Sequence, residues 1–197
     1  MTRKVEFFYD YGSPTAYLAW TQLSRICAKH GATLVYRPFV LGAVFKATGN
    51  AAPGTVPAKL KYMVGDMARW AAKWGVEMNI NPFFPVNTVN LIKAAAGVAL
   101  RMPERLEAFN TACYRAMWIE GLNMADPEVI AGALAKAGFD PKAIFALVED
   151  EEAKAALRAA TEEAVKRGAF GAPTMFVGDK MFFGQDRLEM LEAELAA

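Results

Sequence analysis

The sequence has few of the residues on which metal, thiol and histidine chemistry depend. Its 197 residues include two cysteines and one histidine. Cys27 and Cys113 form no CxxC pair, so we expect two buried, inert thiols and a protein of the reducing cytoplasm. His30 falls at the polar end of a predicted helix, where we expect it to be solvent-exposed. These shortages exclude a disulfide framework, a zinc site and a Ser-His-Asp or Cys-His catalyst.

The chain also lacks an excess of charge and a long apolar run. It carries 22 basic and 21 acidic residues, which leaves no basic stripe for a nucleic acid. The apolar run at residues 94–100 is far too short to cross a bilayer, and the N-terminus lacks the cleavage pattern of a secretory signal. With 54% hydrophobic residues, we expect one soluble domain, or one with a large insertion, and neither a nucleic-acid nor a membrane partner.

Strand and turn signals lie at the two ends of the chain. Near the N-terminus, β-type runs at residues 4–11 and 32–41 flank a helical pattern that stops at Gly31. The two strands of such a β-α-β unit should be parallel. Near the C-terminus, β-type runs at residues 174–177 and 180–183 flank a Gly-Asp turn, which predicts a hairpin, and a final helix follows.

The middle of the chain is predicted to be helical. Residues 42–58 read as a loop because they are rich in glycine and proline. Helical patterns then continue to Gly168, with Asp-Pro N-caps at Asp126 and Asp140. A β-α-β half followed by a β-β-α half is the order of the thioredoxin fold. We therefore predict an α/β, thioredoxin-like fold with a large all-helical insertion, divided into a first half at 1–45, a mostly helical domain with its return helix at 46–168, and a second half at 169–197.

The pair Ser13-Pro14 is the strongest candidate for a functional corner. Pro14 suits the first position of a helix and Ser13 suits the N-cap, so Ser13 is either a simple cap or a group presented for chemistry. A dithiol oxidoreductase of this fold would have CxxC at residues 13–16, which read Ser-Pro-Thr-Ala, so the chain cannot exchange a disulfide of its own there. A helix N-terminus and a hydroxyl would instead favour the thiolate of a ligand. Because thioredoxin-like proteins have a cis proline opposite this corner, we predict a cis Ala172–Pro173 bond.

The whole chain resembles the 2-hydroxychromene-2-carboxylate isomerases, relatives of the kappa-class glutathione transferases and of the DsbA-type oxidoreductases. The resemblance is carried by FYDYGSPTAYLA, by TGN followed by PAKLKYMVGDMARWA, and by FGAPTMFVGDKMFFGQDRLEML. It implies a glutathione-dependent enzyme that converts 2-hydroxychromene-2-carboxylate to trans-o-hydroxybenzylidenepyruvate in bacterial naphthalene breakdown. It also implies a homodimer, for which an exposed aromatic patch around Trp118 is a candidate surface.

The same resemblance implies roles for particular residues. Ser13 would be the active-site serine that faces the glutathione sulfur. The other implied glutathione contacts are Asn50, Lys59, Ala172, Pro173, Phe183, Gly184, Gln185 and Asp186. Asp186 would also cap the last helix, and Phe84 falls in the loop of the substrate pocket. A substrate carboxylate could be held by Lys46, Lys59 or Arg37.

Several alternatives stay open at this point. Residues 54–57 read Gly-Thr-Val-Pro where some of these isomerases have an Asn-Arg pair, and Phe84 replaces a tyrosine. A kappa-like glutathione transferase or peroxidase, which consumes glutathione, is therefore the alternative, and a non-catalytic carrier is a third reading. Asn50 could be a turn residue and Lys59 a solvated one. The stripe of Met63, Met67 and Met78 either lines an aromatic-binding cleft or simply packs.

Overall fold

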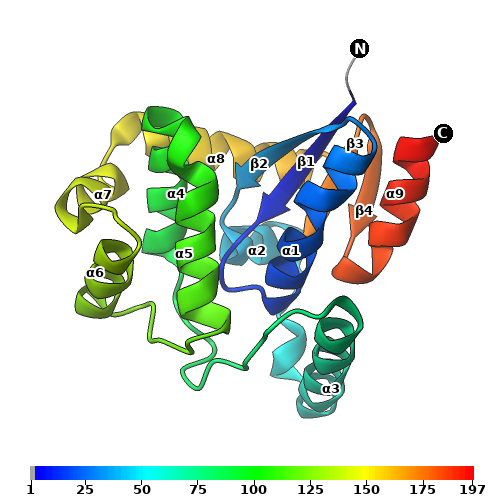
Figure 1. Cartoon of the computed structure of the whole chain (residues 1–197), viewed down its shortest axis with the longest axis horizontal. Coiled ribbons are helices and arrows are strands. Elements are labelled where there is room, and N and C mark those ends of the chain that lie inside the picture. Colours follow the sequence, from blue (N-terminus) through cyan, green and yellow to red (C-terminus); the bar gives the residue numbers. More distant parts are fainter. Residues whose placement is uncertain (1–2) are drawn as a thin grey trace.

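A mixed four-stranded sheet forms the centre of the molecule in the computed structural model, which describes residues 3–197 (Figure 1). In spatial order its strands are β2 (Thr33–Pro38), β1 (Lys4–Tyr9), β3 (Thr174–Val177) and β4 (Lys180–Phe183). β1 pairs with β2 in parallel, whereas the β1–β3 and β3–β4 pairs are antiparallel. The predicted parallel pair and the predicted hairpin are both confirmed. The division into segments 1–45, 46–168 and 169–197 stays a prediction. Residues 1 and 2 of the first segment lie outside the described part of the chain.

Alternation along β1 directs its side chains to two separate cores. Val5, Phe7 and Tyr9 are fully buried with residues of α1 (Pro14–Lys29) and α9 (Leu188–Ala196). Phe8 points the other way and packs with residues of α2 (Leu41–Thr48) and α8 (Glu151–Lys166). Because successive side chains of a strand alternate between faces, the single run Phe7-Phe8-Tyr9 anchors both layers.

The remaining helices form two groups beside the sheet (Figure 1). The helices α4 (Val89–Arg101), α5 (Leu106–Trp118), α6 (Pro127–Lys136) and α7 (Pro141–Val148) lie together on one side, and α3 (Pro57–Trp74) lies below α1. Short 3₁₀ turns occur at Pro53–Thr55, Pro103–Arg105 and Gln185–Arg187. No helix within residues 3–197 is long and apolar enough to span a membrane.

Short-range signals predicted several helix ends correctly. Ser13, Asp126 and Asp140 accept a hydrogen bond from the first turn of α1, α6 and α7, so these three predicted N-caps are confirmed. Gly31 follows α1 with a positive φ of 62°, as a glycine after a helix C-cap often does. At Gly97, a Cβ would come within 2.6 Å of Leu147, which explains why α4 can approach α7 closely only with glycine there.

The predicted loop at residues 42–58 is wrong in its first part, and the predicted strand at residues 32–41 is too long. β2 ends at Pro38, and α2 occupies Leu41–Thr48. The N-cap of α2, Val40, has no side chain that can cap a helix. The capping oxygen comes instead from Asp10, whose Oδ2 accepts a hydrogen bond from the Leu41 N–H at 3.0 Å. A helix whose cap lies 31 residues away carries no local start signal.

Three further expectations are corrected. Trp118 is buried, and its Nε1 donates to the Tyr11 carbonyl at 2.9 Å, so Trp118 itself cannot be part of an exposed aromatic patch. His30 is largely covered rather than solvated, with Nε2 3.1 Å from Glu192 Oε1. Asp186 does not cap α9, because a 3₁₀ turn precedes that helix and the Asp186 carboxylate pairs with Arg187 at 2.6 Å. The prediction that Cys27 and Cys113 are buried is confirmed.

Candidate functional site

The Ser13 hydroxyl does more than cap α1. Its Oγ accepts from the Ala16 N–H at 3.1 Å and donates to the Ala172 carbonyl at 3.1 Å. Thr15 Oγ1 lies 3.0 Å from Ser13 Oγ and donates to the same carbonyl at 3.2 Å. Ser13 is buried. Two hydroxyls from the first turn of α1 therefore converge on one backbone oxygen of a loop that lies 157 residues or more away.

The corner before α1 is fixed by the residues on either side of Asp10. The Tyr9 and Tyr11 hydroxyls both donate to Asn110 Oδ1 of α5, at 2.9 and 2.6 Å. The Ser13 N–H donates to the Asp10 carbonyl at 3.0 Å. These contacts tie the end of β1 to the helical part of the molecule and set where the α1 N-terminus points.

Asp10 itself joins three segments through its buried carboxylate. Oδ1 accepts from the Gly12 N–H at 3.0 Å and from Thr88 Oγ1 at 2.5 Å, and Oδ2 accepts from the Leu41 N–H at 3.0 Å. Burial raises the pKa of Asp10 above its usual value, although the three hydrogen bonds act in the opposite direction. One side chain thus connects the Ser13 corner, the start of α2 and the start of α4.

The loop opposite Ser13 contains the predicted cis bond. The Ala172–Pro173 peptide is cis, which confirms the expectation, and Phe84–Pro85, which was not predicted, is cis as well. Gly171 lies against the ring of Phe183, where a Cβ would come within 2.8 Å of the ring. Asn50 Nδ2 donates to the Phe170 carbonyl at 2.8 Å. The segment after α2 is thereby tied to the loop that carries Ala172.

A cavity of about 300 Å³ opens between these elements. It brings together eight of the residues predicted from the resemblance: Ser13, Asn50, Phe84, Ala172, Phe183, Gly184, Gln185 and Asp186. Pro173, Lys46 and Lys59 do not line it, and both lysines are exposed. Arg37 also lies elsewhere and is paired with Glu6 and Glu163.

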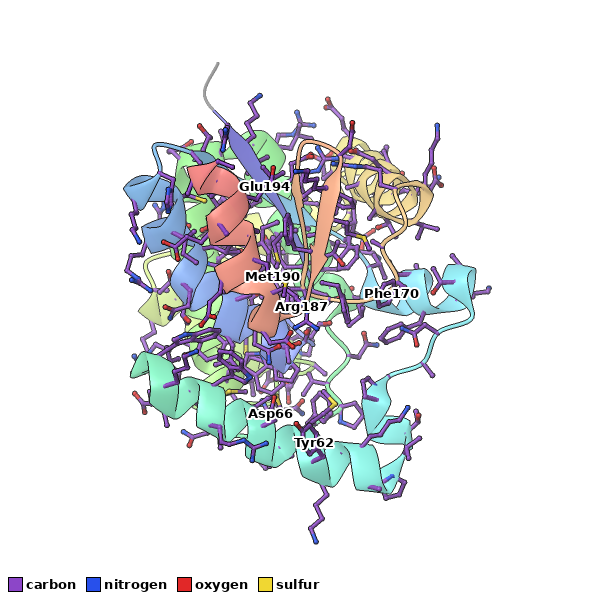
Figure 2. The ribbon with its side chains drawn as sticks, turned by 90° about the vertical axis from the view of Figure 1, so that its right-hand side faces the viewer. Tyr62, Asp66, Phe170, Arg187, Met190 and Glu194 are labelled. Carbon is purple, nitrogen blue, oxygen red and sulfur yellow. The ribbon has the colours of Figure 1, made fainter. Side chains whose placement is uncertain are left out.

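Helices α2 and α3 supply an apolar wall of the cavity. Phe45 of α2 and Leu60, Met63 and Met67 of α3 line it, so two residues of the methionine stripe face the cavity. Asp66 of α3 also lines it and pairs with Arg69 at 3.0 Å. Figure 2 shows α3 running beneath the rest of the molecule, with Asp66 on the side that faces Arg187. Thr15, on the first turn of α1, and Asp66, on α3, are site residues that the sequence did not predict, because nothing in their local sequence distinguishes them from ordinary helix residues.

The charges of the cavity lining and the state of the two cysteines limit the chemistry that the chain itself can supply. Its lining contains two carboxylates, Asp66 and Asp186, and no lysine or arginine among the described residues. Burial raises the pKa of Cys27 to about 11, and burial raises the pKa of Cys113 as well, so neither is a thiolate at neutral pH. In residues 3–197 no group of three His, Cys, Asp or Glu side chains could hold a metal ion.

His30 cannot reach this site. It follows the last residue of α1, whose 16 residues span about 24 Å at 1.5 Å per residue. Ser13 precedes the first residue of the same helix. A Ser-His pair is therefore excluded by the length of α1.

A thioredoxin fold with a serine hydroxyl in place of the redox cysteine, facing a cis-proline loop, defines the class of this site. Comparison with known proteins agrees: the DsbA-like thioredoxin domain model matches residues 4–196. The 2-hydroxychromene-2-carboxylate isomerase of Sphingobium xenophagum is 34% identical, with 99% of each chain covered. Glutathione S-transferase kappa 1 of Rattus norvegicus is 31% identical, over 96% of this chain and 89% of its own.

A solved structure of a 2-hydroxychromene-2-carboxylate isomerase superposes with a TM-score of 0.86 at 29% identity, over 98% of this chain and 94% of that one. The chain belongs to the DsbA-like thioredoxin family and, within it, to the family of the 2-hydroxychromene-2-carboxylate isomerases.

Proposed function

We propose that this protein is a glutathione-dependent cis–trans isomerase that converts 2-hydroxychromene-2-carboxylate to trans-o-hydroxybenzylidenepyruvate in aromatic hydrocarbon catabolism. The observation that carries the proposal is the Ser13 hydroxyl, held at the N-terminus of α1 within 3.1 Å of the Ala172 carbonyl at the wall of a cavity. The names of relatives at 34% and 32% identity over nearly the whole chain support the substrate.

The residues around the cavity fit a small thiol peptide. The protein offers no thiolate of its own, so a thiolate has to come from a ligand. Asp186 and Asp66 suit an ammonium group, and the amides of Asn50 and Gln185 suit the polar groups of a peptide. Ala172 lies in a loop whose backbone can pair with an extended peptide. The carboxylates thus suit the ammonium of the γ-glutamyl part of glutathione, and the Ala172 backbone suits the cysteinyl part.

The α1 N-terminus would stabilise an ionised sulfur. Its aligned peptide dipoles carry about half a positive charge, and its first N–H groups have no partner within the helix. The Ser13 hydroxyl can add a hydrogen bond to the sulfur. Because Thr15 also donates to the Ala172 carbonyl, Ser13 can turn away without leaving that oxygen unpaired. Bound glutathione would supply a thiolate that adds reversibly to a conjugated double bond. The addition would leave a single bond, which can rotate, and loss of the thiolate would restore the double bond.

A kappa-like glutathione transferase or peroxidase is the second candidate, and the lining of the cavity favours it. Within residues 3–197 no lysine or arginine lines the cavity, whereas the isomerase substrate carries a carboxylate. The first candidate therefore requires a lysine outside the lining, Lys59 or Lys46, to reach the bound acid. A transferase acting on an apolar electrophile requires only the wall of Phe45, Met63 and Met67.

The test is an absorbance assay of the purified protein with 2-hydroxychromene-2-carboxylate, with and without substoichiometric glutathione. We expect conversion to the trans pyruvate only when glutathione is present, with the thiol content unchanged at the end. No conversion, together with consumption of glutathione in the presence of chlorodinitrobenzene or a hydroperoxide, would replace the isomerase with the transferase.

A further inference from the structure

The helix α2 has two faces that line two different hollows. Leu41 and Phe45 line the cavity at Ser13. Val40, Ala43 and Ala47 line a second and larger hollow of about 650 Å³ between α2 and α8. This volume falls within the range of about 300–1,000 Å³ that is typical of small-molecule sites.

The residues that face each other across α2 and α8 explain why a groove lies between these helices. On α8, Leu157, Thr161 and Val165 recur every four residues and form one stripe of the floor. On α2, Ala43 and Ala47 also lie four residues apart, and their side chains are too short to fill the space between the helices. The floor is therefore apolar, and the hollow exists because α2 presents alanine to α8.

The rim of this groove is positively charged. Its lining includes Lys93 of α4 and three cations of α8, against a single carboxylate, Glu162. Lys154 is engaged by Glu149 and Glu151 at 2.7 and 3.1 Å. Within the described residues, the other rim cations have no ion pair: Lys93, Arg158 and Lys166. An apolar floor below unpaired cations is complementary to a small molecule with an apolar body and one anionic group.

The groove is also connected to the Ser13 corner through the start of α2. Thr161, a buried residue of the groove floor, accepts a hydrogen bond from the Val40 N–H at 3.1 Å. The next N–H, that of Leu41, donates to Asp10. A molecule in the groove would thus touch the same helix end that the Asp10 carboxylate holds on the opposite side.

We propose that the groove between α2 and α8 is a second binding site, for a small aromatic carboxylate whose ring lies on the floor and whose carboxylate meets the rim cations. Titration of the protein with 1-naphthoate by isothermal calorimetry tests this. We expect binding at least tenfold tighter than that of the uncharged 1-naphthalenemethanol. Equal affinity for the two compounds, or no binding of 1-naphthoate below about 10 mM, would overturn the proposal.

The rim cations are tested by the double variant Arg158→Gln/Lys166→Gln. We expect its dissociation constant for 1-naphthoate to rise at least tenfold. The matched control is Lys4→Gln/Lys142→Gln, which removes two exposed lysines outside the groove and should change the constant less than twofold. Similar effects of both pairs would show a nonspecific response to net charge and would contradict the proposed site.

A crossed pair of filling variants separates this groove from the cavity at Ser13. Ala43→Phe should abolish 1-naphthoate binding, while Met63→Trp, which fills the other cavity, should leave it intact. Circular dichroism and thermal unfolding establish that each variant is folded, and Ala47→Leu replaces Ala43→Phe if the latter is not. The opposite pattern would place the ligand at Ser13 and would refute a second site, whether or not the protein is an isomerase.

Discussion

Two helices begin at the cavity, and their N-termini are held in different ways. The first turn of α1 is capped by Ser13, the residue directly before it. The first turn of α2 is capped by Asp10, which lies 31 residues earlier. A local cap is visible in the sequence and leaves its hydroxyl free for a second partner. A distant cap is invisible in the sequence and makes two segments depend on one side chain.

The largest effect is expected from removal of the distant cap. Asp10→Ala leaves three donors without an acceptor: the buried Thr88 Oγ1 and the partly buried N–H groups of Gly12 and Leu41. Since each such group costs about 1–3 kcal/mol, the free energy of unfolding should fall by about 3 kcal/mol or more. Urea unfolding measures it, with Asp140→Ala as the control, because loss of that exposed cap should cost only about 1 kcal/mol. Equal losses would show that the Asp10 carboxylate contributes no more stability than an ordinary exposed helix cap.

The local cap is expected to matter more for turnover than for stability. If the Ser13 hydroxyl stabilises a bound sulfur, Ser13→Ala should lower kcat/KM about 100-fold, as the loss of one oriented hydrogen-bond donor does at other sites. The free energy of unfolding should fall by only about 1 kcal/mol. Asp126→Ala removes a cap that lies outside the cavity and should cost similar stability while leaving turnover unchanged. A Ser13→Ala variant with nearly normal turnover would reduce Ser13 to a cap.

A smaller effect is expected at Thr15. Thr15→Val keeps the shape of the side chain but removes the hydroxyl that donates to the Ala172 carbonyl. Ser13 would then be the remaining side-chain donor to that oxygen and less free to turn to a ligand, so we expect a loss of kcat/KM of about tenfold or less. Thr15→Ser should restore activity, because it restores the hydroxyl. If Thr15→Ser is as impaired as Thr15→Val, the role belongs to the methyl group and its packing.

The same contrast explains how much of the fold the sequence predicts. Four features can be predicted from the sequence because turn residues, a cap or a family motif marks each of them. They are the sheet topology, the hairpin at residues 174–183, the N-cap at Ser13 and the cis Ala172–Pro173 bond. What stays hidden depends on partners far along the chain. α2 is hidden because Asp10 supplies its cap, and the covered position of His30 is hidden because its partner, Glu192, lies 162 residues away.

The site shows a similar division. The resemblance predicts Ser13, Ala172 and the segment around Gln185, which the structure places around one cavity. It does not predict the apolar wall of Phe45, Met63 and Met67, since a helical stripe looks the same whether it faces a core or a cavity. Only the packing of α3 below α1 decides which of the two it faces.

The last and smallest effect is the pH dependence of stability. The distant cap, Asp10, has a carboxyl group that titrates, whereas the local cap, Ser13, has a hydroxyl that does not. Burial raises the pKa of Asp10 in the folded chain above the value of about 3.8 that it has when exposed, so the folded state binds the proton more tightly than the unfolded state. The stability that Asp10 contributes is then greatest below that exposed value and is lost as the pH rises through the folded pKa. The difference in unfolding free energy between the wild type and Asp10→Asn should therefore shrink from pH 4 toward neutral pH, while the other carboxyl groups cancel. A difference that grows with pH would mean that the hydrogen bonds from Gly12, Leu41 and Thr88 outweigh burial and hold the pKa of Asp10 low.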